Sequence, residues 1–401
     1  MSALRHGAFR TYFAAFFLSN VGTWMHNFAQ TWLMYRLTHR AIDLGYLGLV
    51  FALPMTLMTP LGGALADRFP RAKLLAATQT LSAIVALVIM ALVATGRITR
   101  AHLLVGQFIL ALLLSVDNPT RQSMVAELVP KSDLASALAL NASIFTGAAL
   151  LGPMLGGLLL GKVGPEGLFA MNAVSFVFPL ASLPVLHRKL AQANAPRNRG
   201  GAFDGMAHAL RDVPLRNVLA LGVTTALFGR SYQQMLPVFS ELHFHRGAEG
   251  YATFLSAGGF GAIAGALVLS AFSRTEHRER IVASGVVCTS ASLVAFSWAP
   301  QFAWAVVAIF LAAASAVIAT TSMGTLIQAR VPAELRGRVV SLHVVTVVGL
   351  PFLGSLLLAL LANYTSPAKA LCLFASMSAV AAFAWLLSAK GHASIRRTDG
   401  E

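Results

Sequence analysis

Apolar side chains fill this chain in long runs, and short polar segments separate one run from the next. Each run has the length of about 20 residues that an α-helix needs to cross the ~30 Å hydrocarbon core of a bilayer. Because backbone amides in hydrocarbon must bond within their own segment, each run is expected to be helical. The expected spans are 11–37, 44–66, 74–95, 101–120, 136–161, 166–186, 215–240, 250–272, 281–298, 302–326, 338–362 and 367–389. The pattern predicts an all-α integral membrane protein with twelve transmembrane helices.

Composition agrees with this pattern and excludes a water-soluble domain. Hydrophobic residues make up 57% of the 401 residues and charged residues only 11%, whereas about a quarter of a soluble domain is charged. The first apolar run is too long for the core of a signal peptide, so we expect it to remain as the first span.

The net charge of +15 reflects membrane topology and not binding of nucleic acid, because the basic residues form short clusters between the apolar runs. On one side of the expected layout lie 22 of the 30 Lys and Arg residues, and only seven lie on the other. The seven are Arg36, Arg40, Arg97, Arg100, Lys162, Arg246 and Lys369. Under the positive-inside rule both termini are cytoplasmic and the number of spans is even. We therefore expect a multi-pass protein of the cell membrane, which is the inner membrane in a Gram-negative source.

The spans divide into two pseudo-symmetric halves. The longest polar stretch, 188–216, separates six spans from six, and the segment 155–160 of the fifth span resembles the segment 353–358 of the eleventh. Two parallel repeats of this kind are typical of one large class of secondary transporters. We expect a six-helix half at 1–187, a cytoplasmic linker at 188–214, a second six-helix half at 215–390 and a cytoplasmic tail at 391–401.

The loop after the second span carries a specific motif. It reads Gly62-Gly63-Ala64-Leu65-Ala66-Asp67-Arg68-Phe69-Pro70-Arg71-Ala72-Lys73. This resembles the signature of the major facilitator superfamily, except that the second basic position is Ala72 and Lys73 comes one place late. The resemblance implies that Gly63, Asp67, Arg68 and Arg71 belong to a latch that joins the two halves on the cytoplasmic side. The alternative is a loop whose basic residues only set the topology.

Asp117 lies near the cytoplasmic end of the fourth span and is the only carboxylate that lies within an expected span well before its polar flank. In related transporters an acid at this place pairs with the loop arginine, which is Arg71 here. The alternative is a solvated acid at a helix end.

The fifth span is rich in small residues at Gly147, Gly152, Gly156 and Gly157, with a proline at Pro153. Small residues allow two helices to touch, and proline bends a helix. The pattern resembles the glycine and proline motif of exporters in the superfamily and favours efflux over uptake; the alternative is close packing without directional meaning. Together with segments 118–122, 127–130 and 336–338, it resembles the branch of enterobactin exporters and macrolide efflux proteins.

Polar residues in the first and seventh spans are the candidates for substrate binding. The first span has a stripe of Ser19, Asn20, Thr23, His26, Asn27, Gln30 and Thr31, and the seventh has Arg230, Tyr232, Gln233 and Gln234. Such groups are costly against lipid, so we expect the stripe to face a central cavity. The selected candidates are Trp24, His26, Asn27, Gln30, Arg230, Tyr232 and Gln234. For His26 and Arg230 a structural hydrogen bond is the alternative.

Several kinds of chemistry find no support in the sequence. Spans one, five, seven and eight carry no Asp or Glu at mid-membrane, so a coupling proton would have to use His26 or Asp117. Cys288 and Cys372 lie inside apolar runs, and His243 and His245 suit an interfacial anchor better than a metal pair. There is no nucleotide-binding loop or metal-ligand cluster. We therefore expect neither an enzyme nor a cofactor.

These features predict a secondary active transporter that exports an amphipathic or aromatic small molecule, drug-like or siderophore-like, as an antiporter driven by an ion gradient. The alternatives are an importer or lysolipid-type flippase of the same fold and, from another class, a membrane scaffold or receptor. The expected partners are the substrate, membrane lipids and the coupling ion, with no nucleic acid, and a monomer is expected.

Overall fold

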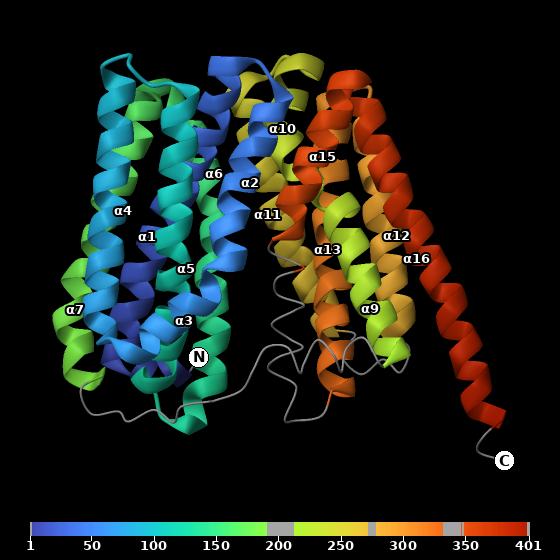
Figure 1. Cartoon of the computed structure of the whole chain (residues 1–401), viewed down its shortest axis with the longest axis horizontal. Helices are drawn as coiled ribbons and strands as arrows, with labels where there is room; N and C mark the ends of the chain where they lie inside the picture. Colours follow the sequence, from blue (N-terminus) through green and yellow to red (C-terminus); the bar gives the residue numbers. More distant parts are fainter. Residues whose placement is uncertain (1, 191–211, 272–277, 332–345, 347–348, 399–401) are drawn as a thin grey trace. The chain divides into compact units, whose positions relative to one another are not determined.

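Every regular element in the described part of the chain is helical (Figure 1). The computed structural model describes residues 2–190, 212–271, 278–331, 346 and 349–398. Most of the expected linker, the segment 336–338 and the side chain of Asp67 lie outside the described residues. An all-α membrane fold is confirmed.

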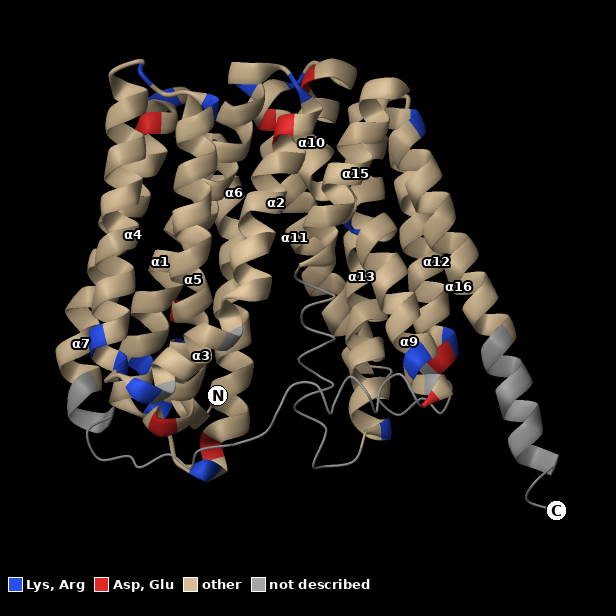
Figure 2. Ribbon diagram, viewed as in Figure 1, with Lys and Arg blue, Asp and Glu red and all other residues tan. Residues whose placement is uncertain are grey.

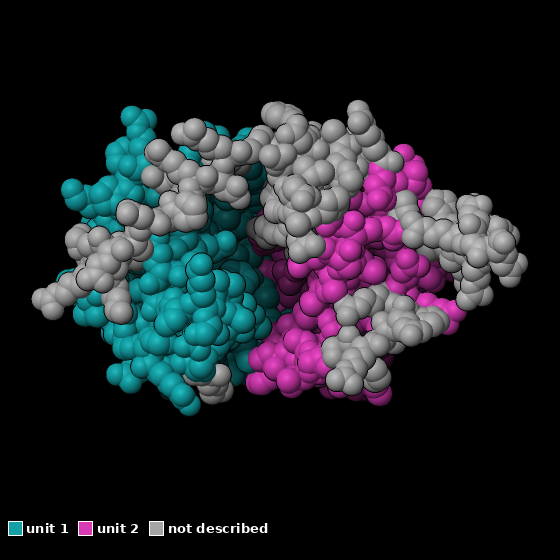
Figure 3. All heavy atoms as spheres, turned by 90° about the horizontal axis from the view of Figure 1, so that it is seen from below, with its two compact units in different colours: residues 1–198, 246–256 teal, residues 199–245, 257–401 magenta. Residues whose placement is uncertain are grey.

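The chain forms two compact units (Figure 3). Unit 1 comprises residues 1–198 and 246–256, and unit 2 comprises residues 199–245 and 257–401. In each unit the charged residues are found mainly at the helix ends, and the middle of the helices is largely uncharged (Figure 2). This distribution is what a protein crossing a bilayer requires.

Unit 1 consists of helices that follow the first six expected spans. They are η1 (Ser2–Arg5), α1 (Gly7–Thr38), α2 (Ala41–Leu57), α3 (Thr59–Arg68), α4 (Arg71–Ala94), α5 (Arg100–Leu128), η2 (Lys131–Asp133), α6 (Leu134–Ser175) and α7 (Val177–Leu190). The second span is divided into α2 and α3 at Met58. Two expected spans meet inside α6 at Gly164, whose φ of 67° breaks the helix.

Unit 2 contains a seventh span that is broken into short pieces. These pieces are α9 (Val213–Thr224), the π-helix η3 (Thr225–Gly229), the 3₁₀-helix η4 (Ser231–Met235), α10 (Leu236–Val238) and the π-helix η5 (Phe239–His243). The helices that follow are α11 (Gly247–Ala271), α12 (Arg278–Ser297), α13 (Phe302–Arg330), α15 (Leu350–Tyr364) and α16 (Pro367–Thr398). The first residues of α11 belong to unit 1.

Seven helical segments of the described residues are long and apolar enough to cross a membrane. One of them, Lys131–Leu186, holds two expected spans, and Ala41–Leu57 and Leu350–Tyr364 are apolar but shorter. Part of the expected span 338–362 lies outside the described residues. The protein is therefore a multi-pass membrane protein, and the count of twelve spans stays a prediction.

Glycines set the closest approaches between helices within each unit. A Cβ atom on Gly62 of α3 would overlap the carbonyl oxygen of Ser115 in α5. In unit 2 a Cβ on Gly265 of α11 would overlap the carbonyl oxygen of Ala314 in α13. The two contacts join the second span to the fourth and the eighth to the tenth, so the same contact recurs at corresponding places in the two units.

The structure predicts different effects for alanine at two adjacent glycines of α3. Gly62→Ala forces the backbone of α5 away, and overpacking of this kind costs about 1–3 kcal/mol. Gly63→Ala meets no atom within 4 Å, so the higher helix propensity of alanine leaves stability unchanged or raises it by up to ~1 kcal/mol. Thermal unfolding of the purified variants in detergent measures the difference, and equal losses at both positions would contradict this account of the packing.

Candidate functional site

The polar stripe of α1 has a buried side and a partly exposed side. Ser19, His26 and Gln30 are 3% exposed or less, whereas Asn27 and Trp24 are only half buried. The expectation that the whole stripe faces one cavity is therefore wrong for the buried side.

His26 lies at the centre of a hydrogen-bond network inside unit 1. One ring nitrogen, Nε2, lies 2.8 Å from Oε1 of Gln30, and the other, Nδ1, lies 3.2 Å from the amide nitrogen of Asn172. The amide nitrogen of Gln30 donates to the carbonyl of Leu103 at 3.1 Å. An amide nitrogen can only donate, so Nδ1 of His26 accepts and Nε2–H donates to Gln30. This assigns a neutral imidazole with its proton on Nε2.

The orientation of Asn172 supports this assignment. Its side-chain oxygen lies 3.5 Å from the Thr23 hydroxyl and 3.4 Å from the Ser175 hydroxyl, and its nitrogen faces His26. The ring of Phe169 packs edge-on against the imidazole, with centroids 4.7 Å apart. The network joins α1 to α5 and α6 and uses both ring nitrogens of His26. In this conformation the polar atoms of His26 and of Gln30 serve packing within unit 1.

The remaining candidates of α1 lie closer to the surface of unit 1. Trp24 packs edge-on against Phe145 with centroids 5.3 Å apart, and its Cβ occupies the space above Gly152. Asn27 is half buried on the same helix. Of the α1 candidates, Trp24 and Asn27 keep the exposure that a ligand contact requires.

Each glycine of the exporter-like pattern in α6 allows a specific close contact. Gly147 faces the ring of Phe17, and a Cβ on Gly156 would lie 2.7 Å from the ring of Phe28. A Cβ on Gly157 would overlap that of Ala252 at the start of α11. Phe28 in turn stacks on Tyr251, the neighbour of Ala252, with centroids 5.1 Å apart and planes 17° apart.

Through these contacts α1 and the start of α11 pack directly against α6. Pro153 is buried inside α6 between the glycine contacts. The close-packing interpretation of the pattern is thus visible in unit 1, while its directional meaning stays a prediction.

Asp117 is buried and bound by donors from two helices. Its Oδ1 accepts from the Thr78 hydroxyl at 3.0 Å and from the Gln79 amide at 2.8 Å, both on α4. Its Oδ2 lies 2.7 Å from Nε of Arg121, one turn further along α5. The guanidinium of Arg121 also covers the ring of Phe16 at 5.3 Å. The carboxylate is 4% exposed and ion-paired inside unit 1, which excludes the alternative of a solvated acid.

Arg71 does not pair with Asp117, so the expected pairing is wrong. Arg71 forms an ion pair with Glu127 near the end of α5. The reason is local. Arg121 follows Asp117 by four residues on the same helix, a spacing at which side chains meet, and it forms the ion pair that was expected of Arg71. Of the other motif residues, Arg68 is exposed beside the ring of Phe69, and a Cβ built on Gly63 would meet nothing within 4 Å.

Asp43 is a buried charge that the sequence interpretation missed. It lies in the first turn of α2 and is 0% exposed. Its Oδ1 lies 2.8 Å from Nε of Arg100 at the start of α5, and the Arg100 guanidinium covers the ring of Tyr46 at 5.3 Å. The expected second span began one residue later, at Leu44. Burial of Asp43 depends on contact between α2 and α5, which hydropathy does not report.

Outside the spans, His6 and Asp133 join the start of α1 to the start of α6. The His6 Nε2 lies 2.7 Å from the Asp133 carboxylate. This hydrogen bond holds the pKa of the Asp133 carboxyl below its usual range.

Arg230 sits at the break in the seventh span. The π-helix η3 ends at Gly229 and the 3₁₀-helix η4 begins at Ser231, and Arg230 between them has φ −118° and ψ −2°. Tyr232 is 4% exposed, and Gln234 is half buried. π-helical turns and broken helices inside membrane spans are frequent at functional sites, because they free backbone groups for ligands. The sequence placed Arg230 in a continuous helix and gave no sign of this break.

No group of three residues able to hold a metal ion occurs among the described residues. His243 lies 3.4 Å from the carbonyl of Ala299 and packs on Phe244. This position agrees with an anchoring role.

The partner of Asp117 can be tested with a double-variant cycle. Asp117→Asn leaves the buried Arg121 without a counter-charge, which costs about 3–5 kcal/mol. Adding Arg121→Gln removes the orphaned charge and is expected to restore much of the lost stability. Thermal unfolding in detergent gives the coupling energy.

Arg71→Gln in the Asp117→Asn background is the matched control and is expected to restore none of the lost stability. Recovery with Arg71→Gln instead of Arg121→Gln would show that Asp117 pairs with Arg71 in solution.

The comparisons with known proteins agree with this architecture. The chain is 26% identical over 212 residues to the uncharacterized MFS-type transporter YfiS of Bacillus subtilis, with 52% of this chain and 50% of that protein covered. It is 23% identical over 261 residues to the Staphyloferrin A transporter of Staphylococcus aureus, covering 64% and 66% of the two chains. These matches span about half to two thirds of the relatives' length.

Solved structures show the same fold at low identity. A POT family transporter in complex with a thioalcohol-conjugated peptide superposes with a TM-score of 0.80 at 12% identity, over 96% of both chains. A bacterial homolog of the human lysosomal transporter Spinster, inward-facing and unoccupied, gives 0.73 at 14% identity, also over 96% of both. The profile of the family MFS_3, described as "Transmembrane secretion effector", matches residues 1–394. The chain therefore belongs to this family of the major facilitator superfamily.

Proposed function

We propose that this protein is a secondary active transporter that exports an amphipathic or aromatic small molecule by alternating access, and that it prefers anionic or phenolic substrates. The observation that carries the proposal is the position of Arg230 at the break of the seventh span. A permanent cation inside a span is costly and is retained where it binds a substrate or an internal partner.

The charge balance of the spans supports an anionic substrate. The buried carboxylates of unit 1, Asp43 and Asp117, are bound to Arg100 and Arg121. The charges of these two carboxylates are therefore balanced within unit 1. We expect the guanidinium of Arg230 to attract a substrate carboxylate or phenolate during transport.

Export is favoured over import by two observations. The family is described as "Transmembrane secretion effector", and α6 carries the exporter-like glycine and proline pattern. One relative is named Staphyloferrin A transporter, and a siderophore-like or drug-like anion is the substrate class that we propose. The transporter works as a monomer in the cell membrane with both termini cytoplasmic, and an ion gradient drives it.

The binding partners of His26 bear on the coupling ion. Both ring nitrogens of His26 are engaged, so a proton carried there would have to displace Asn172. Asp117 is likewise engaged by hydrogen bonds from Thr78 and Gln79 and by the ion pair with Arg121. We therefore expect coupling to require a conformation in which one of these networks is open.

Substrate charge is tested with everted membrane vesicles that contain the protein and a panel of anionic, neutral and cationic amphiphilic dyes. Vesicles with the wild-type protein are expected to accumulate the anions best. Arg230→Gln keeps much of the size and hydrogen bonding but loses the charge. Loss of a charge-assisted hydrogen bond of about 1.5–3 kcal/mol raises the KM for an anion roughly tenfold to a hundredfold.

Arg216→Gln removes an exposed charge from the same span and is the matched control, with unchanged KM expected. If cationic dyes are the best substrates, or if Arg230→Gln carries anions normally, then Arg230 is a structural donor. Accumulation in right-side-out vesicles instead of everted ones would identify an importer.

The cytoplasmic latch is a separate proposal about Asp67. Since Arg71 is held by Glu127, Asp67 is the motif charge that we expect to close the latch at a neighbouring helix N-terminus. Asp67→Asn then shifts the conformational balance roughly tenfold towards the inward-open state, for a loss of about 1.4 kcal/mol. Alkylation of single cysteines on the cytoplasmic side should become faster, and unchanged rates at normal expression would remove Asp67 from the latch.

A further inference from the structure

Three buried hydroxyl groups lie inside unit 2 beside the break of the seventh span. Thr225 of η3, Ser290 of α12 and Ser378 of α16 are 2%, 1% and 1% exposed. Among the described residues, none of these three hydroxyls has a hydrogen-bond partner. Buried hydroxyls without partners are uncommon, because each lost bond to water costs free energy.

Helix geometry places the three groups in one layer. Leu221, Val286 and Ala382 share a core cluster, which continues towards Leu215, Val282 and Trp385. In this direction the residue numbers decrease along α9 and α12 and increase along α16, so α16 runs antiparallel to the other two helices. In the opposite direction, the next turn after Leu221, Val286 and Ala382 contains position 225 on the seventh span, 290 on α12 and 378 on α16. We name these three residues the hydroxyl layer.

A direct distance supports this placement. A Cβ built on Gly229 of η3 would lie 3.0 Å from Oγ of Ser378 and 3.5 Å from Cγ2 of Thr225. The Ser378 hydroxyl therefore points at the π-helical turn that carries Thr225.

Neighbouring hydroxyls in unit 2 behave differently. Thr224 donates to the carbonyl of Leu221 at 3.0 Å, Thr289 to that of Gly285 at 2.8 Å, and Ser297 to that of Val294 at 2.8 Å. This bond to the preceding turn is the ordinary way to satisfy a hydroxyl inside a helix. Four buried hydroxyls of unit 2 are exceptions among the described residues. Ser231 directly follows Arg230 at the break, and the other three are the members of one layer, which indicates a shared ligand.

The chemistry of the layer selects a neutral ligand that both donates and accepts. Each hydroxyl has one donor and two acceptor sites. A cation would find no carboxylate among the three side chains and would lie close to Arg230, which follows η3 directly. An anion would need more donors than three hydroxyls supply. A water molecule with two to four polar partners fits.

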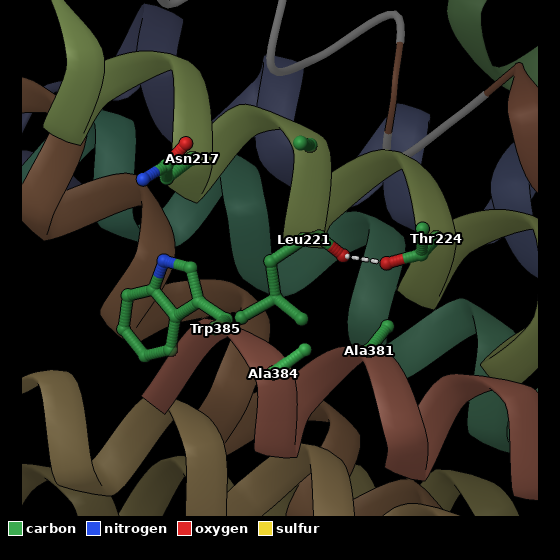
Figure 4. A pocket seen from close by; sticks show the side chains of 7 residues that line it. Asn217, Leu221, Thr224, Ala381, Ala384 and Trp385 are labelled. Carbon is green, nitrogen blue, oxygen red and sulfur yellow. Dashed lines mark hydrogen bonds between the residues drawn. The ribbon is translucent and has the colours of Figure 1, made fainter. Parts of the chain in front are cut away.

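A crevice lies between α9 and α16 near this layer (Figure 4). It has a volume of about 230 Å³ and is lined by Asn217, Ala220, Leu221, Thr224, Ala381, Ala384 and Trp385. Thr224 precedes Thr225 in the chain, and Ala381 lies one turn from Ser378. Since water occupies about 30 Å³ in the liquid, the crevice has room for several molecules.

We propose that the hydroxyl layer is a buried hydration site, in which ordered water bonds Thr225, Ser290 and Ser378 together with backbone groups released at the π-helical turn. This water stabilises the break that positions Arg230. The proposal concerns the structure of unit 2 and holds whether or not Arg230 binds a substrate anion.

The test removes all three hydroxyls while keeping the shape of the side chains, in the triple variant Thr225→Val, Ser290→Ala, Ser378→Ala. If water fills the layer, the variant loses its hydrogen bonds and the melting temperature in detergent falls by several degrees. Ser297→Ala, which removes a hydroxyl bonded to its own helix, is the matched control, and its melting temperature should fall much less. A triple variant as stable as this control, or more stable than the wild type, would show that the layer is dry and overturn the proposal.

X-ray hydroxyl-radical footprinting of the wild-type protein gives a second readout if the triple variant does not fold. Water held at the layer should label the buried Phe374, one turn from Ser378 on α16, several-fold more than the buried Phe254. Labelling no greater than at Phe254 would contradict the proposal. The melting temperature of the wild-type protein should be the same in sodium chloride and in choline chloride. A rise in melting temperature that is specific to sodium and absent from the triple variant would show that a sodium ion, and not water, occupies the layer.

Discussion

The approach of helix backbones through glycine is the constraint on which the rest of this structure depends. Within lipid there is little hydrophobic gain in bringing two helices together, so close packing must supply the attraction. Gly62 against Ser115 in unit 1 and Gly265 against Ala314 in unit 2 bring backbone into contact with backbone. Gly354 extends the rule to the broken span, because a Cβ there would overlap the carbonyl oxygen of Leu227 in η3. The π-helical turn is thus packed directly against α15, and its irregular backbone is shielded from lipid.

Close packing of this kind also decides which polar side chains are available for function. Once α1, α5 and α6 are in contact, His26, Gln30 and Asn172 satisfy one another. Asp117 is satisfied in the same way by α4 and by Arg121. In both cases the partners come from unit 1 itself, so these bonds stabilise that unit internally. Asn27 of α1 is only half buried.

The sequence predicted the helices and the motif but not the partners or the irregular backbone. Hydropathy reports contact with lipid, which is why the spans and the small-residue faces of α6 could be read from it. Ion pairs depend on which helices touch, so Arg71 was assigned to Asp117 although Glu127 and Arg121 were nearer in the fold. Asp43 escaped notice because a charge at the edge of an apolar run resembles a loop residue. The break at Arg230 has no signature of its own, since Gly229 alone does not distinguish a π-helical turn from a close contact.

The break and the hydroxyl layer are best understood as one structural element. A change from π-helix to 3₁₀-helix leaves backbone groups without their regular partners, and each such group buried in a membrane costs free energy unless something else bonds it. An uninterrupted α-helix would avoid this cost, so the break persists only if neighbouring groups compensate for it. Thr225, Ser290 and Ser378 bring uncommitted donors and acceptors to that point, and Gly354 shields the Leu227 carbonyl. The charge of Arg230 can therefore be presented at the irregular turn because the three helices behind it carry the polar groups that a regular span would not need.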